Sequence, residues 1–156
     1  MIDQTIANEK VIVFGASGFL GSHVADALSA AGYRVRLFDR SPSPYLKSNQ
    51  EMIVGDIMNL DQVIEAAKDA SIVYNFAAIA DIDEAHDKPI PTATINVLGN
   101  MHVLEAARIT GARRFVFASS VYVYSESGSF YRASKQAAER FTETYHERYG
   151  LNYTIL

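Results

Sequence analysis

A tyrosine and a lysine four residues apart form a pair suited to proton transfer. Tyr131 and Lys135 fall in a stretch whose apolar residues recur at helical spacing, so their side chains share one face of a predicted helix. A free phenol has a pKa of about 10, and a lysine ammonium beside it favours the phenolate. Tyr131 could then act as a general acid and base toward a substrate hydroxyl. The pair alone is weak support, because nine tyrosines make this spacing common by chance.

Two serines, Ser119 and Ser120, close an apolar run that predicts a strand over residues 114–120. Ligands of open α/β sheets bind outside the carboxyl ends of parallel strands. The Ser120 hydroxyl could therefore reach the same substrate oxygen as Tyr131. A serine in this place also commonly caps the strand end or bonds to the backbone, and the sequence leaves both interpretations open.

A glycine-rich turn near the N-terminus indicates a site for a phosphate anion. Residues 10–21 read KVIVFGASGFLG. This run predicts a buried strand that is followed by Gly15, Gly18 and Gly21 and by the start of a helix. Free N–H groups and the helix dipole favour a pyrophosphate there, and glycine lets it approach the main chain. The spacing G-x-x-G-x-x-G departs from the common G-x-G-x-x-G, so the mechanism matches although the letters differ.

An acidic residue at the end of the second predicted strand favours a dinucleotide. Asp39 closes residues 34–39 and lies 18 residues after Gly21, where a dinucleotide-binding fold places the carboxylate that bonds the ribose hydroxyls of NAD. Its charge would repel the 2′-phosphate of NADP. Arg40 beside it could bind that phosphate, so NAD is favoured and NADP is the alternative. A plain glycine turn followed by a solvated acid is the simpler interpretation, and the flanking strands and helix disfavour it.

Strand and helix patterns alternate along the chain. Strands are predicted over residues 11–14, 34–39, 51–56, 71–78, 114–120 and 152–156, and helices after Gly18 and over residues 60–70, 91–110 and 131–149. With right-handed crossovers, this alternation predicts a doubly wound parallel α/β sheet of order 3-2-1-4-5-6, a Rossmann fold with three α/β/α layers. We expect one NAD(P)-binding domain over residues 1–156. Because the sequence stops inside a strand, we also expect it to be the N-terminal part of a longer chain.

Apolar residues at helical spacing support two of these helices. The helix over residues 91–110 is marked by Ile95, Leu98, Val103, Leu104, Ala106 and Ala107, and the helix over residues 131–149 by Ala137, Ala138, Phe141 and Tyr145.

Composition excludes several classes of function. The net charge of −4 disfavours nucleic-acid binding, and the absence of cysteine excludes disulfides and thiolate metal sites. No apolar run approaches the roughly 20 residues of a membrane helix, and the N-terminus is too polar for a signal peptide. We therefore expect a cytoplasmic protein without a nucleic-acid or membrane partner.

An acidic cluster near residue 84 could be interpreted as a metal site. It comprises Asp81, Asp83, Glu84, His86 and Asp87. A polar loop leading into a helix is the commoner origin of such a cluster, so no metal is predicted.

Seven motifs occur together and in one order over essentially the whole chain. They are the glycine turn, Asp39, Gly55-Asp56-Ile57, Asn75-Phe-Ala-Ala78, Asn96-x-x-Gly99, Ser119-Ser120-x-x-Val123-Tyr124 and Tyr131-x-x-x-Lys135. This set resembles the extended short-chain dehydrogenase/reductase family, the NAD-dependent epimerases and dehydratases that act on nucleotide sugars. The resemblance implies transient hydride transfer to NAD, a keto intermediate, and catalytic roles for Ser120, Tyr131 and Lys135.

The resemblance also implies which residues hold the cofactor. The amides of Phe19 and Leu20 would meet the pyrophosphate, and Asp56 and Ile57 the adenine. The implied set is Gly15, Gly18, Phe19, Leu20, Gly21, Asp39, Arg40, Asp56, Ile57, Phe76, Ala77, Ala78, Asn96, Ser119, Tyr131 and Lys135. Family members commonly form homodimers through a four-helix bundle, here from the helices over residues 91–110 and 131–149.

Three features depart from the family pattern. Ser125 follows Tyr124 where glycine is usual, only six residues separate Tyr124 from Tyr131, and the substrate domain is missing after Leu156. The first two predict an unusual substrate pocket.

The alternatives to a nucleotide-sugar enzyme are an NAD(P)-dependent ketone or aldehyde reductase of the same family and a non-catalytic NAD-binding sensor module.

Overall fold

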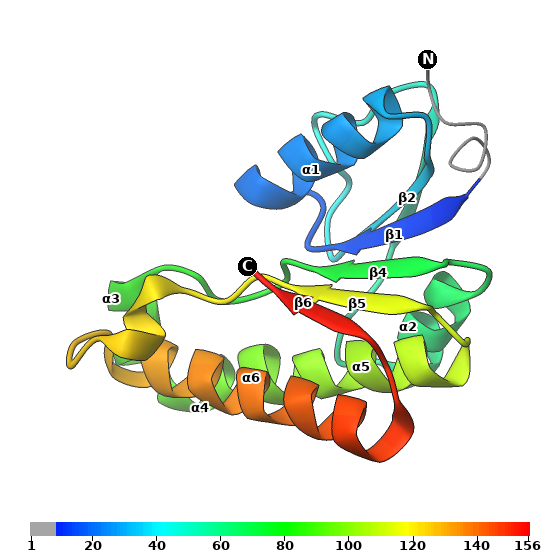
Figure 1. The fold of residues 1–156 in the computed structure, drawn as a ribbon. Helices are drawn as coiled ribbons and strands as arrows, with labels where there is room; N and C mark the ends of the chain where they lie inside the picture. The colour runs from blue at the N-terminus through cyan, green and yellow to red at the C-terminus, as the bar shows by residue number, and fades with distance from the viewer. Residues whose placement is uncertain (1–8) are drawn as a thin grey trace.

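Six parallel strands form one sheet in the computed structural model, which describes residues 9–156 (Figure 1). The strands lie in the order β3-β2-β1-β4-β5-β6. Their bounds are β1 Lys10–Phe14, β2 Arg34–Asp39, β3 Gln50–Val54, β4 Ile72–Asn75, β5 Arg114–Phe117 and β6 Tyr153–Ile155. Phe14 pairs with Phe38 of β2 and with Asn75 of β4, so the carboxyl ends of the central strands meet at one edge. The predicted fold class and strand order are confirmed.

Helices cover both faces of the sheet (Figure 1). Helix α1 (Phe19–Ala30) lies on one face, and α2 (Leu60–Ala67), α5 (Asn100–Ile109) and α6 (Ser129–Tyr149) lie on the other. Successive side chains of a strand point to opposite faces, so a strand covered on both sides must be apolar throughout. In β1, residues 11 and 13 are buried in the cluster that includes α1, and residues 12 and 14 in the cluster that includes α2 and α5.

Three strands end two or three residues earlier than predicted, because the chain turns away from the sheet at its carboxyl edge. β3 ends at Val54 rather than at residue 56, β4 at Asn75 rather than at 78, and β5 at Phe117 rather than at 120. The Asn75 side chain explains one of these turns, since its Oδ1 accepts a hydrogen bond from Ala77 N at 3.1 Å. Most of the predicted binding residues therefore lie in loops beyond the strand ends.

The predicted helix over residues 91–110 is present but interrupted. It comprises α4 (Pro89–Ala93), the π-helical segment η1 (Thr94–Gly99) and α5. A π-helical turn contains more residues than an α-helical turn, so it changes which side chains face the core. Leu98 is 44% exposed, whereas Asn96 is buried.

Helix α6 begins two residues before its predicted start and ends at Gly150, which has φ +71° and donates to His146 O at 2.8 Å. Of the apolar residues that mark this helix, Ala138 is buried but Phe141 is 36% exposed. Buried positions of α6 instead include the polar side chains Ser134, Lys135, Glu139 and Thr142. Each of these has a hydrogen-bond partner, which offsets the cost of burying it.

The acidic stretch after β4 forms the short helix α3 (Ile82–Asp87). Asp81 caps it, since its Oδ1 accepts a hydrogen bond from Glu84 N at 2.8 Å. Within residues 9–156, no three His, Asp or Glu side chains are arranged to hold a metal ion. In the same part of the chain, no helix combines the length and apolar character that crossing a bilayer requires.

Candidate functional site

The turn after β1 brings strand and helix into close contact. Gly15 has φ +76°, and its N–H donates to Phe38 O at 3.0 Å. A Cβ at Gly15 would lie 2.5 Å from Ala77 N, and a Cβ at Gly21 would lie 2.2 Å from Gly15 O. Because no side chain fits at these distances, Gly15 lets the turn pack against the loop after β4, and Gly21 lets α1 pack against the turn.

Gly18 differs because the space beside it is open. A Cβ there would meet only Gly15 O, at 3.4 Å, and its φ of −79° suits any residue. Gly18 is the N-cap of α1 without a side-chain hydrogen bond, and the first turn contains no acidic residue. The first helical bond runs from Ser22 N to Gly18 O at 3.0 Å, so the N–H groups of residues 19–21 precede it. These N–H groups and the open space at Gly18 form what we call the glycine cradle. An anion such as a pyrophosphate fits there.

The Asp39 carboxylate lies beside the glycine turn. Its Oδ2 accepts a hydrogen bond from Ser17 N at 3.0 Å, and its Oδ1 accepts one from Ser41 N at 3.4 Å. The Ser17 hydroxyl also donates to Ser41 O at 2.7 Å, which joins the two loops. Arg40, which lies between Asp39 and Ser41 in the chain, is exposed. The carboxylate keeps lone pairs for a further donor, as contact with a ribose hydroxyl requires.

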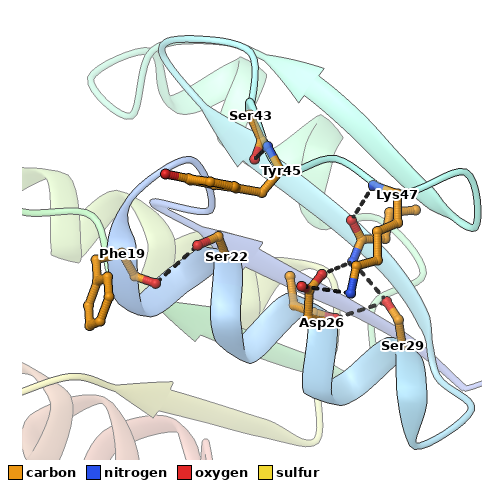
Figure 2. A network of polar contacts seen from close by, with 9 residues as sticks. Phe19, Ser22, Asp26, Ser29, Ser43, Tyr45 and Lys47 are labelled. Atoms are coloured by element: carbon orange, nitrogen blue, oxygen red, sulfur yellow. Dashed lines mark hydrogen bonds and ion pairs between the residues drawn. The ribbon is translucent and has the colours of Figure 1, made fainter.

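The loop that follows Asp39 is folded back onto α1 (Figure 2). Lys47 Nζ lies 2.7 Å from Asp26 Oδ2, and Gln50 Nε2 donates to Asp26 Oδ1 at 3.1 Å and to Ser29 Oγ at 3.0 Å. The hydrogen bond from Lys47 holds the pKa of Asp26 below its usual range. These contacts fix the far end of the loop, and Figure 2 shows the Tyr45 side chain lying along α1.

Asp56 and Ile57 lie in the loop after β3, next to the end of β2. Gly55 N donates to Asp39 O at 2.9 Å, which places this loop beside the Asp39 strand end. The Asp56 side chain is exposed, and its Oδ1 accepts a hydrogen bond from Met58 N at 2.9 Å. Ile57 is buried, so its side chain belongs to the core, and its carbonyl oxygen lies 2.9 Å from His102 Nδ1.

The loop after β4, which carries Phe76, Ala77 and Ala78, is held by two buried asparagines. Asn75 Nδ2 donates to Asn100 Oδ1 at 2.8 Å. Further along, Asn96 Oδ1 accepts from Ile79 N at 2.7 Å, and Asn96 Nδ2 donates to Ile79 O and to Ser134 Oγ, each at 3.0 Å. The Asn96 amide therefore positions this loop and connects it to α6.

Tyr131 and Lys135 are packed together against the end of β5. Tyr131 is 9% exposed and Lys135 is 4% exposed. Lys135 Nζ lies 5.7 Å from the Tyr131 ring centroid and 4.8 Å from that of Phe117, and it donates to Ala118 O at 2.8 Å. Burial lowers the pKa of Lys135 to about 8. The predicted lysine–tyrosine neighbourhood is therefore present in the structure.

Ser120 begins the short 3-10 helix η2 (Val121–Tyr124). Its Oγ accepts a hydrogen bond from Tyr122 N at 3.3 Å, so the capping interpretation is supported. That contact uses a lone pair and leaves the hydroxyl hydrogen free to donate, so capping and substrate contact are compatible. The Tyr122 ring packs edge-on against Tyr131, with ring centroids 6.4 Å apart.

The glycine cradle, the Asp39 carboxylate and the Tyr131–Lys135 pair all border the carboxyl edge of one parallel sheet, where dinucleotides bind. A family model described as the NAD dependent epimerase/dehydratase family matches residues 11–156. The chain belongs to that family.

Individual relatives agree with the epimerase/dehydratase family assignment. UDP-glucose 4-epimerase of Rhizobium leguminosarum bv. trifolii is 32% identical over 124 residues, which cover 76% of this chain and 38% of the relative. A 3-beta-hydroxysteroid dehydrogenase of Mycolicibacterium neoaurum is 32% identical over 131 residues, which cover 77% and 35%. The crystal structure of UDP-glucose 4-epimerase from Brucella ovis in complex with NAD is 27% identical with a TM-score of 0.87, covering 94% and 50%. The chain spans about a third to a half of the length of these proteins.

Two buried polar residues of the site were not predicted from the sequence. Ser134 donates to Tyr131 O at 2.8 Å, and Glu139 accepts the hydrogen bond of the Ser119 hydroxyl. Both lie on α6 at helical spacing from Tyr131 and Lys135. A polar residue on the helix face that carries a predicted catalytic pair is the sequence feature that could have indicated them.

Proposed function

We propose that this chain binds NAD and carries the acid–base residues of a nucleotide-sugar epimerase or dehydratase. The observation that supports this most directly is Lys135, buried beside Tyr131 at the carboxyl edge of the sheet that also bears the glycine cradle. Membership of the NAD dependent epimerase/dehydratase family and the UDP-glucose 4-epimerases among the relatives support the cofactor and the substrate class.

The residues around the cradle suit NAD. The free N–H groups of Phe19 and Leu20 would hold the pyrophosphate, and Gly18 would let it approach. Asp39 would accept hydrogen bonds from the adenosine ribose, and Asp56 from the adenine amine. Their two negative charges disfavour the extra phosphate of NADP, although the exposed Arg40 could bind one. When bound, NAD supplies the acceptor for a substrate hydride and, once reduced, the donor that returns it.

Proton transfer falls to Tyr131. Its phenolate would take a proton from the sugar hydroxyl while the Ser120 hydroxyl donates a hydrogen bond to the same oxygen. Two features of the chain place positive charge near the Tyr131 ring: the neighbouring Lys135, which keeps its proton at pH 7, and the N-terminal turn of α6, which begins at Ser129. The sugar would then pass through a keto form before the hydride returns.

Replacement of the phenol tests this assignment. In Tyr131→Phe we expect turnover of UDP-glucose to fall by about 10²–10⁴-fold, because the proton acceptor is lost. The dissociation constant for NAD should stay within about twofold, because the ring remains and the cradle is untouched. Product formation is followed by NMR and NAD affinity by calorimetry.

Either of two results would count against the assignment. A parallel loss of NAD affinity in Tyr131→Phe would give the residue a binding role instead of a proton-transfer role. Net consumption of the reduced cofactor in step with product would identify a reductase, and net consumption of the oxidised cofactor would identify a dehydrogenase, because epimerases and dehydratases regenerate their cofactor.

We also propose a homodimer formed through α5 and α6. Phe141, Tyr145 and Tyr149 follow one another at four-residue spacing along α6, and the first and last are exposed. The Tyr145 hydroxyl donates to Glu105 Oε2 at 3.0 Å, and the Arg108 guanidinium lies 4.9 Å from the Tyr149 ring centroid. These contacts join the two helices into one surface with apolar content that a second copy would cover.

A further inference from the structure

A buried carboxylate beside the site has no part in the proton transfer described above. Glu139 lies on α6 one turn after Lys135 and is 8% exposed. Glutamate is almost never buried to this extent unless it is paired. None of the ion pairs among residues 9–156 includes Glu139. Its partner is the hydroxyl of Ser119, which donates to Glu139 Oε1.

This hydrogen bond is one of two that attach the end of β5 to α6. Lys135 Nζ donates to Ala118 O at 2.8 Å, and the next residue, Ser119, donates to Glu139 one helical turn further on. The backbone N–H of Ser119 also bonds to Leu156 O at 3.1 Å. Ser120 follows Ser119 directly, and Tyr131 lies on α6. The position of Ser120 relative to Tyr131 therefore depends on these attachments to α6.

An apolar side chain would fill the place of Glu139 without the cost of removing a carboxylate from water. The retained acceptor therefore has to contribute something that packing alone does not. Fixing two groups in reactive geometry is such a contribution, because a displacement of about 1 Å can slow a reaction by about 10²-fold.

We propose that Glu139 is a positioning residue that, through Ser119, holds the Ser120 hydroxyl in place opposite Tyr131. This inference rests on the proposed function for its catalytic consequence, and on the two hydrogen bonds for its structural one. What the site requires at position 139 is a hydrogen-bond acceptor of glutamate's length.

Four variants of the full chain, with NAD present, test the proposal. Ser119→Ala removes the donor, Glu139→Leu removes the acceptor, and Glu139→Gln keeps an acceptor oxygen without the charge. Thr142→Val is the matched control, because Thr142 is 1% exposed on the same helix but its hydroxyl bonds only within the helix, to Ala138 O at 2.8 Å. Amide hydrogen exchange of Ser119 and Val123 is measured alongside kcat and KM for UDP-glucose.

We expect the donor and acceptor deletions to act alike. In Ser119→Ala and Glu139→Leu, exchange of the two amides should speed up by about tenfold relative to Thr142→Val, because the strand end is released. In both variants kcat should fall by about tenfold with KM within about twofold, since the interaction matters for reacting geometry more than for binding. Glu139→Gln should stay within about threefold of the parent chain in both measurements.

Two results would overturn the proposal: exchange in Ser119→Ala no faster than in Thr142→Val, or Glu139→Gln no better than Glu139→Leu. If the full-length protein that carries this chain does not turn over UDP-glucose or related nucleotide sugars, the proposed function fails instead. The exchange rates then decide by themselves whether Glu139 holds the strand end.

Discussion

The side chain of Lys135 is an amine that is buried almost completely from solvent. It is 4% exposed, and burial lowers its pKa from the ordinary 10.5 to about 8. The shift disfavours the ammonium, yet below about pH 8 the folded chain still holds the charge that Tyr131 would use. The burial of this side chain thus links the chemistry of the site to the stability of the fold.

The lowered pKa of Lys135 predicts a rise in stability at alkaline pH. Between pH 8 and 10.5 the unfolded chain binds more protons at this residue than the folded chain, so the free energy of unfolding should increase with pH. The desolvation cost is fully present below pH 8 and relieved above pH 10.5. Relative to Lys135→Met, the parent chain should gain up to about 3 kcal/mol across this interval, at about 1.4 kcal/mol per pKa unit.

Urea denaturation of both proteins, without cofactor, from pH 7 to 11 measures this difference. The Met variant serves as the reference because it shares every other titrating group. Parallel curves for the two proteins would contradict the assigned burial effect.

The residues of the glycine cradle and of the Tyr131–Lys135 pair were largely predictable from sequence, because residue type and spacing indicate their chemistry. Gly15, Gly18 and Gly21 needed only a strand before them and a helix after them. Glu139 was not predictable in this way, since the partner that explains its burial, Ser119, lies 20 residues away and meets it only in the folded chain.

The π-helical segment η1 is the element that the sequence pattern did not indicate. Hydrophobic periodicity assumes a regular 3.6-residue turn, and one wider turn shifts every later side chain around the axis. The shift leaves Leu98 exposed and buries Asn96 against the loop after β4. The strand order, by contrast, followed from alternation alone, because parallel strands with right-handed crossovers admit few arrangements.

Removal of the Asn96 side chain should therefore destabilise the chain. Asn96→Ala deletes the partner of both Ile79 N and Ile79 O and the bond to Ser134 Oγ. We expect the free energy of unfolding to fall by about 2–3 kcal/mol, because polar groups that were paired lose their partners. Asn49→Ala, at an exposed asparagine in the loop after β2, is the control and should change stability by less than about 0.5 kcal/mol.

Chemical denaturation with coincident probes is the appropriate measurement. Equal stabilities for Asn96→Ala and Asn49→Ala would show that the amide of Asn96 does not hold the loop.

At the scale of the whole molecule, α6 carries an aromatic stripe whose first and last members, Phe141 and Tyr149, are exposed, while Tyr145 between them packs against the core. Phe141, Tyr145 and Tyr149 are apolar or aromatic at four-residue spacing, a pattern typical of a buried face. The structure buries the polar face of α6 against the sheet instead. A sequence pattern cannot distinguish a face buried within one chain from a face buried between two.

The proposed homodimer can be tested on this stripe. The parent chain should sediment as a dimer, and Phe141→Glu should sediment as a monomer, because a charge without a partner is placed in the interface. NAD affinity should not change. Val54→Glu is the control, since Val54 is also exposed, at 54%, but lies on the edge strand β3. A monomeric parent chain, or dissociation caused equally by both variants, would contradict the interface.

Calorimetric titration of the chain with NAD, for the parent and for Gly18→Ala, measures whether the turn at Gly18 holds the cofactor. A methyl group at Gly18 meets only Gly15 O at 3.4 Å, so the variant should fold, yet the group occupies the space proposed for the pyrophosphate. We expect one NAD per chain, with affinity at least about tenfold weaker in Gly18→Ala, a loss of about 1.4 kcal/mol. Folded parent chain that binds neither NAD nor NADP, or equal affinity in the two proteins, would contradict this expectation.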